Sequence, residues 1–152
     1  MGTRGACNDS RVLTRIDHVG IAVRDLERSV SFYETTFGLQ VVARERHEDQ
    51  GVAEAMLVVA EGPSGGSYVQ LLEPTREDSP VGRFLARRGE GVHHIGYGVA
   101  DVAAALAAIS AEGIRLVDER PRHGSMGAAI AFLHPRDVGG VLTELVQAPT
   151  RR

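Results

Sequence analysis

Two histidines stand side by side in the segment GVHHIGYGV, residues 91–99. Imidazole nitrogens are common ligands of divalent transition metals, so the pair raises the question of a metal site. Neighbouring side chains of a β-strand point to opposite faces of the sheet. We therefore predict that only one of His93 and His94 faces such a site, and other parts of the sequence must decide which.

An internal repeat selects His94. The segment RIDHVGIAVRDLERSV (15–30) aligns with GVHHIGYGVADVAAAL (91–106) at a constant offset of 76 residues. This alignment places His94, and not His93, over His18. We predict that His18 and His94 lie on equivalent inner faces, and that His93 is an outward, hydrogen-bonded packing residue.

Each predicted inner face carries one histidine among mostly small residues. Such a face suits a strand that lines a cavity, whereas the bulkier opposite face suits contact with a helix. The two inner faces consist of Ile16, His18, Gly20 and Ala22 in the first copy and of Val92, His94, Gly96 and Gly98 in the second.

Two further polar residues occupy matching places in the last strand of each copy. Gln70 lies in SYVQLLEP (67–74) and Glu144 lies in VLTELVQ (141–147). If each half curls around its inner face, these two oxygen ligands converge with the two imidazoles. Such a set suits Co²⁺, Mn²⁺, Ni²⁺ or Zn²⁺. A single strand histidine is usually an ordinary hydrogen-bonded residue, but four polar groups at repeat-related positions favour a metal site.

Both copies predict the same order of elements. An alternating strand precedes a helix that Asp25 or Asp101 caps and that Gly38 or Gly113 ends. A short helix over 79–89 joins the two copies. Three further strands complete each copy, at 39–45, 52–60 and 67–74 in the first and at 114–119, 128–133 and 141–147 in the second.

The predicted fold class is therefore α+β, with two tandem βαβββ modules that form a curled mixed sheet around a metal site. A chain of 152 residues is long enough for one sizeable core and short for two. We expect a disordered N-terminal tail over 1–13 and a single domain over 14–148. In that domain the first module spans 14–75, the linker helix 79–89 and the second module 90–148.

Composition limits the possible partners. The 17 basic and 20 acidic residues give a formal net charge of −3, without the basic excess that nucleic acid or an anionic membrane would require. No apolar run is long enough to span a bilayer, and residues 1–14 lack the apolar core of a signal peptide. Cys7 is the only cysteine, so no internal disulfide is possible. This favours a reducing compartment, and we expect a cytoplasmic protein.

Six longer motifs occur along the chain, namely IDHVGIAV (16–23), FYETTFGL (32–39), DQGVAEAML (49–57), YVQLLEPTREDSPVGRFLARRGEGVHHI (68–95), FLHP (132–135) and GVLTEL (140–145). Together they resemble the vicinal oxygen chelate superfamily, which includes glyoxalases, bleomycin resistance proteins and dioxygenases. Within it they resemble the methylmalonyl-CoA epimerase family. The resemblance covers nearly all of residues 14–147.

The resemblance implies a reaction and a set of site residues. It implies that His18, Gln70, His94 and Glu144 bind a divalent metal, with Co²⁺ favoured over Mn²⁺, Ni²⁺ and Zn²⁺. It implies interconversion of (2R)- and (2S)-methylmalonyl-CoA through a metal-stabilised enolate. Glu54 matches the family's general base, and Glu144 is the candidate for the proton carrier on the other face. The implied partner is a small acyl-CoA substrate, and we expect a homodimer.

The surroundings of Glu54 add an argument of their own. In the predicted strand 52–60 its carboxylate shares a face with Met56, and burial there would raise its pKa towards neutrality. A base that both takes and returns a proton needs such a pKa. The residues alone leave a glutamate on an edge strand equally open, and Glu48 and Asp49 are alternative bases in a charged run that is more simply a solvated turn.

Three other functions stay open. A glyoxalase I-type lyase would use the same metal face for a glutathione hemithioacetal. An extradiol dioxygenase would bind Fe²⁺ through two histidines and one glutamate, which leaves Gln70 without a role. A binding protein of the antibiotic-sequestering type would lack the metal residues.

The remaining polar residues have simpler expected roles. His47, His123 and His134 have no repeat partner on the inner face, and His134 is expected to shape a turn. The Gly-rich segment 122–127 could offer backbone N–H groups to a carboxylate. Several arginines are candidates for contact with CoA phosphates but are individually expected to be solvated: Arg83, Arg87, Arg88, Arg120 and Arg122.

Overall fold

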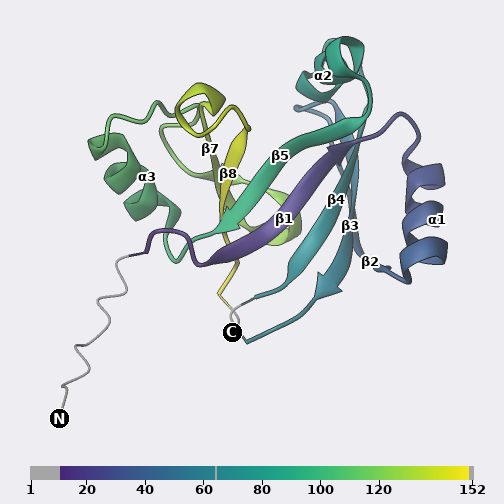
Figure 1. Cartoon of the computed structure of the whole chain (residues 1–152), viewed down its shortest axis with the longest axis horizontal. Helices are drawn as coiled ribbons and strands as arrows, with labels where there is room; N and C mark the ends of the chain where they lie inside the picture. The colour runs from purple at the N-terminus through teal and green to yellow at the C-terminus, as the bar shows by residue number, and fades with distance from the viewer. Residues whose placement is uncertain (1–10, 64, 151–152) are drawn as a thin grey trace.

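The computed structural model describes residues 11–63 and 65–150 (Figure 1). Most of the predicted N-terminal tail over 1–13, including Cys7, lies outside the described residues. Within the described part of the chain, the search for a helix long and apolar enough to span a membrane finds none.

The described residues form an eight-stranded mixed sheet in the order β2-β3-β4-β1-β5-β8-β7-β6. The central strands β1 and β5 pair antiparallel, and each pairs in parallel with the last long strand of its own half, β4 or β8. The predicted α+β class with a curled mixed sheet is confirmed. The strands are β1 (Arg15–Ala22), β2 (Gln40–His47), β3 (Val52–Ala60), β4 (Ser67–Pro74), β5 (Gly91–Gly98), β6 (Arg122–His123), β7 (Ala129–Leu133) and β8 (Thr143–Gln147).

Two helices pack on equivalent parts of the sheet. Figure 1 shows α1 (Leu26–Phe37) against the end formed by β2, β3 and β4, and α3 (Val102–Ala111) against β7 and β8. The side chain of Asp25 accepts a hydrogen bond from the backbone N–H of Arg28 at 3.0 Å, and Asp101 caps α3 in the same way. These caps fix where each helix begins, as predicted from the repeat.

Glycine and proline mark the remaining helix ends. Gly38 ends α1 in the left-handed conformation, with φ of 70°. In the second half α3 ends at Ala111 with Glu112 as its C-cap, and the predicted helix-ending glycine, Gly113, with φ of 81°, is the next residue. The linker helix α2 (Pro80–Arg88) begins after Ser79, whose hydroxyl accepts a hydrogen bond from the N–H of Gly82 at 3.1 Å.

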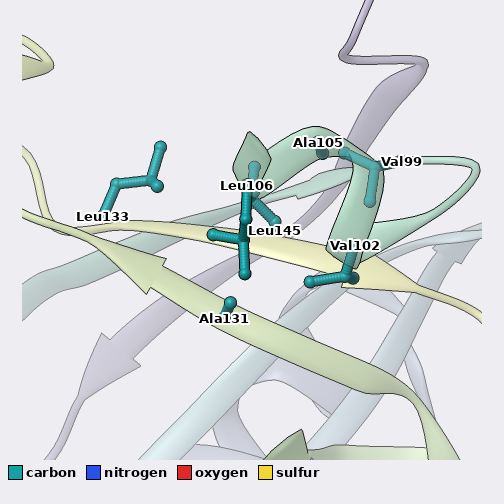
Figure 2. Packing of buried hydrophobic residues seen from close by; sticks show 7 residues of the cluster. All are labelled: Val99, Val102, Ala105, Leu106, Ala131, Leu133 and Leu145. Carbon is teal, nitrogen blue, oxygen red and sulfur yellow. The ribbon is translucent and has the colours of Figure 1, made fainter. Parts of the chain in front are cut away.

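Helices α1 and α3 each cover a hydrophobic core of their own. Figure 2 shows the core beneath α3, where Val102 and Leu106 of the helix lie near Ala131 of β7 and Leu145 of β8. The matching core beneath α1 contains Val30 with Leu57 and Leu71, among others. Burial of these side chains stabilises the packing of the two helices on the outer face of the sheet. The polar groups described below lie on the opposite, inner face.

One predicted strand is wrong. Residues 114–119 do not form a strand; Leu116 alone makes an isolated bridge with Leu133. The carboxylate of Asp118 accepts a hydrogen bond from the backbone N–H of Phe132 at 2.9 Å. A side chain thus takes a bond that a neighbouring strand would otherwise supply, which is the usual way in which aspartate competes with a ladder.

The central pair β1–β5 contains two bulges. Its register shifts twice; the first shift leaves Asp17 as an extra residue on β1, and the second leaves His93 as an extra residue on β5. Asp17 and His93 precede His18 and His94, so the same repeat relates the two bulges. A bulge interrupts strict alternation and re-aims the side chains next to it.

The bulges correct the predicted inner faces. Strict alternation would place Ile16 on the face of His18 and Val92 on the face of His94. Instead, Ile16 is 57% exposed and Val92 is 53% exposed, whereas both histidines are buried. The predicted alternation is therefore wrong at the one residue that lies just before each bulge.

Candidate active site

Three of the four predicted ligands meet directly. The Nε2 atoms of His18 and His94 are 3.0 Å apart. Glu144 Oε2 lies 3.3 Å from Nε2 of His18 and 2.9 Å from Nε2 of His94. All three side chains are buried, with exposures of 6% or less. Buried imidazoles and a carboxylate that turn their ligand atoms toward one point form an arrangement that can hold a metal ion.

Two glycines make room for the imidazole rings. Gly96 lies between His18 and Glu144 in the sheet register, and a Cβ atom built on Gly96 would lie 2.3 Å from the ring of His18. Gly20, at the repeat-related position, would meet the ring of His94 at the same distance. Each ring therefore lies across the neighbouring strand where only glycine leaves space.

Gln70 adds an acceptor without a partner. It is 5% exposed and lies next to Gly20 in the register of β4 and β1. Its Nε2 donates hydrogen bonds to Glu54 at 2.8 Å and to Ser125 at 3.2 Å. Its Oε1 is buried and has no hydrogen-bond partner among the described residues. Buried polar atoms normally have a partner, so an amide oxygen in this state fits a cation ligand.

Electrostatics at the cluster favour positive charge. Burial lowers the pKa of His18, but the carboxylates of Asp17 and Glu144 outweigh burial and raise it to about 9. Burial raises the pKa of Glu144, but hydrogen bonds with His18 and His94 outweigh it and lower that pKa to about 2. Glu144 is thus ionised at neutral pH, and the donor set of two imidazoles, one carboxylate and one amide oxygen fits a divalent cation.

Glu54 lies beside this cluster and is only 4% exposed. Burial raises the pKa of its carboxyl group, and a hydrogen bond from Ser125 and the proximity of His47 offset part of that rise. Ser125 donates to Oε1 of Glu54, whereas Gln70 donates to Oε2. The predicted burial of Glu54 is present, and the alternatives Glu48 and Asp49 lie in an exposed turn.

The prediction that His47 lies outside the site is wrong. Its Nε2 is 3.4 Å from Oε1 of Glu54, and its side chain is 23% exposed. The pairing of β2 with β3 in a hairpin could have predicted this contact. Glu45 pairs with Glu54, and His47 lies two residues further along the same face. The side chain of Ser125 also belongs to the site, whereas the Gly-rich pattern of its segment predicts only backbone contacts.

The prediction that His93 faces away from the site is also wrong. Its Nδ1 lies 2.9 Å from Nδ1 of His94, and its ring contacts Phe84 of α2 with centroids 5.1 Å apart. The bulge at His93 is the physical reason, because it removes the alternation on which the prediction depended. Burial and the neighbouring His94 lower the pKa of His93 to about 4.

Three other predicted positions lie outside the cluster of His18, His94 and Glu144. His134 shapes a turn, as expected, since its Nδ1 accepts a hydrogen bond from the N–H of Arg136 at 3.3 Å. His123 is exposed at the end of β6. Arg122 pairs with Asp118 at 3.2 Å and also lines a cavity that reaches His94 and Glu144.

Two cavities open onto the cluster. The larger of these two, called the main cavity here, has a volume of about 360 Å³ and is lined by the candidate base and by three of the four candidate ligands. A second cavity of about 210 Å³ reaches His18, Ser125 and Glu144. A substrate can therefore contact both kinds of group at once. The main cavity is lined by His47, Glu54, Gln70, His93, His94 and Glu144, among others.

Comparison with known proteins places the chain in a family. Residues 17–132 match the family model described as the Glyoxalase/Bleomycin resistance protein/Dioxygenase superfamily. The chain belongs to this superfamily. Within it the chain groups with methylmalonyl-CoA epimerases. The human mitochondrial methylmalonyl-CoA epimerase is 37% identical over 90% of this chain and 75% of its own length. The ethylmalonyl-CoA/methylmalonyl-CoA epimerase of Cereibacter sphaeroides is 36% identical over 90% of this chain and 99% of its own length.

Solved structures agree with this grouping. A methylmalonyl-CoA epimerase in complex with methylmalonyl-CoA and NH4+ is 56% identical, covers 91% of this chain and 96% of its own, and superposes with a TM-score of 0.88. A Streptomyces coelicolor methylmalonyl-CoA epimerase variant in complex with 2-nitronate-propionyl-CoA is 55% identical, with coverages of 91% and 99% and the same TM-score.

Proposed function

We propose that this protein is a metal-dependent methylmalonyl-CoA epimerase that interconverts the 2R and 2S forms of its substrate. The observation that carries the proposal is one cavity that joins a His–His–Glu cluster to a buried carboxylate with a raised pKa. Relatives more than 50% identical that were solved with methylmalonyl-CoA or an analogue support the substrate class.

The metal would be held by His18, Gln70, His94 and Glu144. The unpartnered Oε1 of Gln70 and the three converging ligand atoms support this set. Two neutral imidazoles and an amide oxygen accompany one carboxylate, so a divalent ion would keep one net positive charge toward an anionic substrate. We propose Co²⁺, with Mn²⁺, Ni²⁺ and Zn²⁺ as alternatives.

The reaction needs this charge because a proton α to a thioester is far less acidic than a carboxylic acid. A gap of about ten pK units corresponds to roughly 14 kcal/mol. No carboxylate base overcomes such a gap alone. A bound divalent ion supplies Lewis acidity, which stabilises the negative charge that develops on the thioester oxygen as the proton leaves.

Glu54 is the proposed base. Ser125 and Gln70 each donate to one of its two oxygens, so the carboxylate is held in a fixed orientation. Its raised pKa allows it to accept the C2 proton and to give a proton back. We propose Glu144 as the carrier on the other face of the substrate.

We extend the proposal to the organisation of the chain. A single domain over 14–148, built from modules 14–75 and 90–148, is supported by the continuous sheet that crosses both. A homodimer is supported by the aromatic side chains of Phe32 and Phe37, which are 52% and 60% exposed on α1. The single cysteine of the sequence supports a cytoplasmic location.

Deuterium exchange tests the proposed function. The purified protein loaded with Co²⁺ should exchange the C2 proton of methylmalonyl-CoA with D₂O and should interconvert the two stereoisomers. It should not turn over the hemithioacetal of methylglyoxal and glutathione. Turnover of the hemithioacetal without exchange at C2 would instead identify a glyoxalase I-type lyase.

A further inference from the structure

Each ligand histidine has its second ring nitrogen occupied by the residue just before it. Nδ1 of His18 lies 2.8 Å from Oδ1 of Asp17. Nδ1 of His94 lies 2.9 Å from Nδ1 of His93. Asp17 and His93 are repeat-related, and both are the extra residues of the two bulges in β1 and β5. The same local device thus occurs twice in the site.

The bulge is what brings these residue pairs together. In a regular strand, a residue and its predecessor point to opposite faces, so Asp17 could not reach the ring of His18 from the inner side. The extra residue removes that alternation and turns both side chains toward the cluster. The chain therefore departs from regular pairing at the two places where a contact to Nδ1 is made.

These contacts determine which nitrogen can bind a metal. The Nε2 atoms of His18 and His94 are the ones that face each other and Glu144. A neutral imidazole that binds through Nε2 carries its proton on Nδ1, and that proton needs an acceptor. Asp17 and His93 are the groups within hydrogen-bond distance of those Nδ1 atoms.

We propose that Asp17 and His93 are paired positioning residues that accept the Nδ1 protons of His18 and His94 and so fix Nε2 as the ligand atom of both. This inference rests on the metal site of the proposed function. It assigns a role to the first histidine of the pair His93–His94. His93 does not bind the metal, but orients the histidine that does.

The two supports differ in strength. Asp17 is 6% exposed and is held by Arg15, whose Nη2 donates to Oδ2 at 2.6 Å. A carboxylate that is fixed in this way makes the imidazole of His18 a stronger donor to a metal. His93 offers only a neutral nitrogen, and its ring is held by contact with Phe84. We expect a larger loss of metal affinity at Asp17 than at His93.

Metal affinity measured by chelator competition tests this pair. Each variant is titrated with Co²⁺ against a chelator, and its fold is checked by circular dichroism before metal is added. Asp17→Ala and His93→Phe should each lose about 10–100-fold in Co²⁺ affinity, the usual effect of removing such a partner. The variant His123→Phe, which changes an exposed histidine at the end of β6, should bind Co²⁺ as the unmodified protein does.

Two polar variants at His93 separate positioning from packing. The amide oxygen of asparagine occupies about the place of the histidine Nδ1, whereas that of glutamine reaches the place of Nε2. His93→Asn should therefore keep Co²⁺ affinity within about threefold, and His93→Gln should lose as much as His93→Phe. Equal affinities for the asparagine and glutamine variants would overturn the role of His93.

A measurement on the unmodified protein avoids variants that fail to fold. In the Zn²⁺-loaded protein, the ¹⁵N shifts of the imidazole nitrogens should show Nε2 as the ligand of both histidines and a proton on each Nδ1. Ligation through Nδ1 of either histidine overturns the inference. If His18→Ala and His94→Ala bind Co²⁺ normally, the metal site of the proposed function fails. If they lose Co²⁺ while the Asp17 and His93 variants do not, only this inference fails.

Discussion

The two halves of the sheet are alike at their centre and unlike at their edges. Near the centre, each half supplies a histidine, a bulge before it and a glycine that makes room for the histidine ring of the other half. At the edges, the first half has the long strands β2 and β3, with Glu54 on β3. The second half has only the two-residue β6 beside β7, and the position that corresponds to Glu54 lies near the apolar Ala128.

This difference separates two tasks. The duplicated centre provides the proposed metal ligands, and the divergent edges provide the proposed proton transfer. The second half contributes Ser125 from its short loop, and Ser125 reaches across to Glu54 of the first half. In an epimerisation the same negative charge develops on the thioester oxygen in both directions, whereas the proton leaves and returns on opposite faces of the substrate and can use a different carrier on each.

Removal of either central histidine should have the largest effect on metal affinity and activity. We expect His18→Ala and His94→Ala to lose Co²⁺ affinity beyond the roughly 10–100-fold that outer partners contribute, and to lose activity with the metal. Both losses should be large because the repeat places the two histidines at equivalent positions, and the loss at His18 should be the larger because Asp17 makes its imidazole the stronger donor. Metal analysis of the purified variants and chelator competition measure this. A large loss in one variant with normal binding in the other would contradict the symmetry of the centre.

The variant Glu54→Gln should show that proton transfer at the edge of the sheet is independent of metal binding at its centre. The amide keeps the shape of the side chain and removes the proton acceptor, so bound Co²⁺ should remain. Turnover should fall by about 10²–10⁴-fold, the usual contribution of a positioned general base. Exchange at C2, measured separately from each stereoisomer, should fall more for one than for the other.

Two other results for Glu54→Gln would contradict this prediction. Full activity would place the base elsewhere, with Glu48 or Asp49 as the next candidates. Loss of bound metal would instead make Glu54 a structural part of the metal centre. Gln70 is the route by which that would happen, because its Nε2 donates to Glu54.

The sequence allowed prediction of the centre better than of the edges. Residue types repeated at a fixed offset identified His18 and His94, and strand periodicity placed Gln70 and Glu144 on the same side. Periodicity has no means of showing a bulge, so the side on which His93 lies was predicted wrongly. The contact of His47 with Glu54 depends on hairpin register, which two separate strand predictions do not provide.

A smaller effect is expected at the two central glycines. A methyl group at Gly20 or Gly96 would collide with a buried imidazole ring, which should cost about 1–3 kcal/mol of unfolding free energy, as overpacking usually does. Urea denaturation of Gly20→Ala and Gly96→Ala measures this. Gly91→Ala is the matched control on β5, since a Cβ atom there meets no atom within 4 Å. Equal stability of all three variants would show that the rings shift freely.

The smallest effect is expected at the divergent edge of the second half. Hydrogen bonds from Arg115 hold the pKa of Asp137 below its usual range, with Nε to Oδ2 at 2.8 Å and Nη2 to Oδ1 at 2.9 Å. This ion pair ties the segment 114–119, which lacks a strand, to the turn after β7. A depressed pKa stabilises the fold above the pKa of the unfolded state, about 3.9, and this contribution is lost as the pH falls through the folded value.

Asp137→Asn should therefore be less stable than the unmodified protein at pH 7, and the gap between their unfolding free energies should close as the pH falls below about 4. Chemical denaturation at a series of pH values follows that gap. Arg115→Gln should give a smaller gap of the same sign, because it removes the guanidinium but keeps the backbone N–H of residue 115, which donates to Asp137 Oδ2 at 2.9 Å. The effect should be small, since both side chains are partly exposed to solvent and salt screens such pairs. A gap that stays constant down to pH 3 would mean that the segment is held by the backbone bonds of Phe132 and not by this pair.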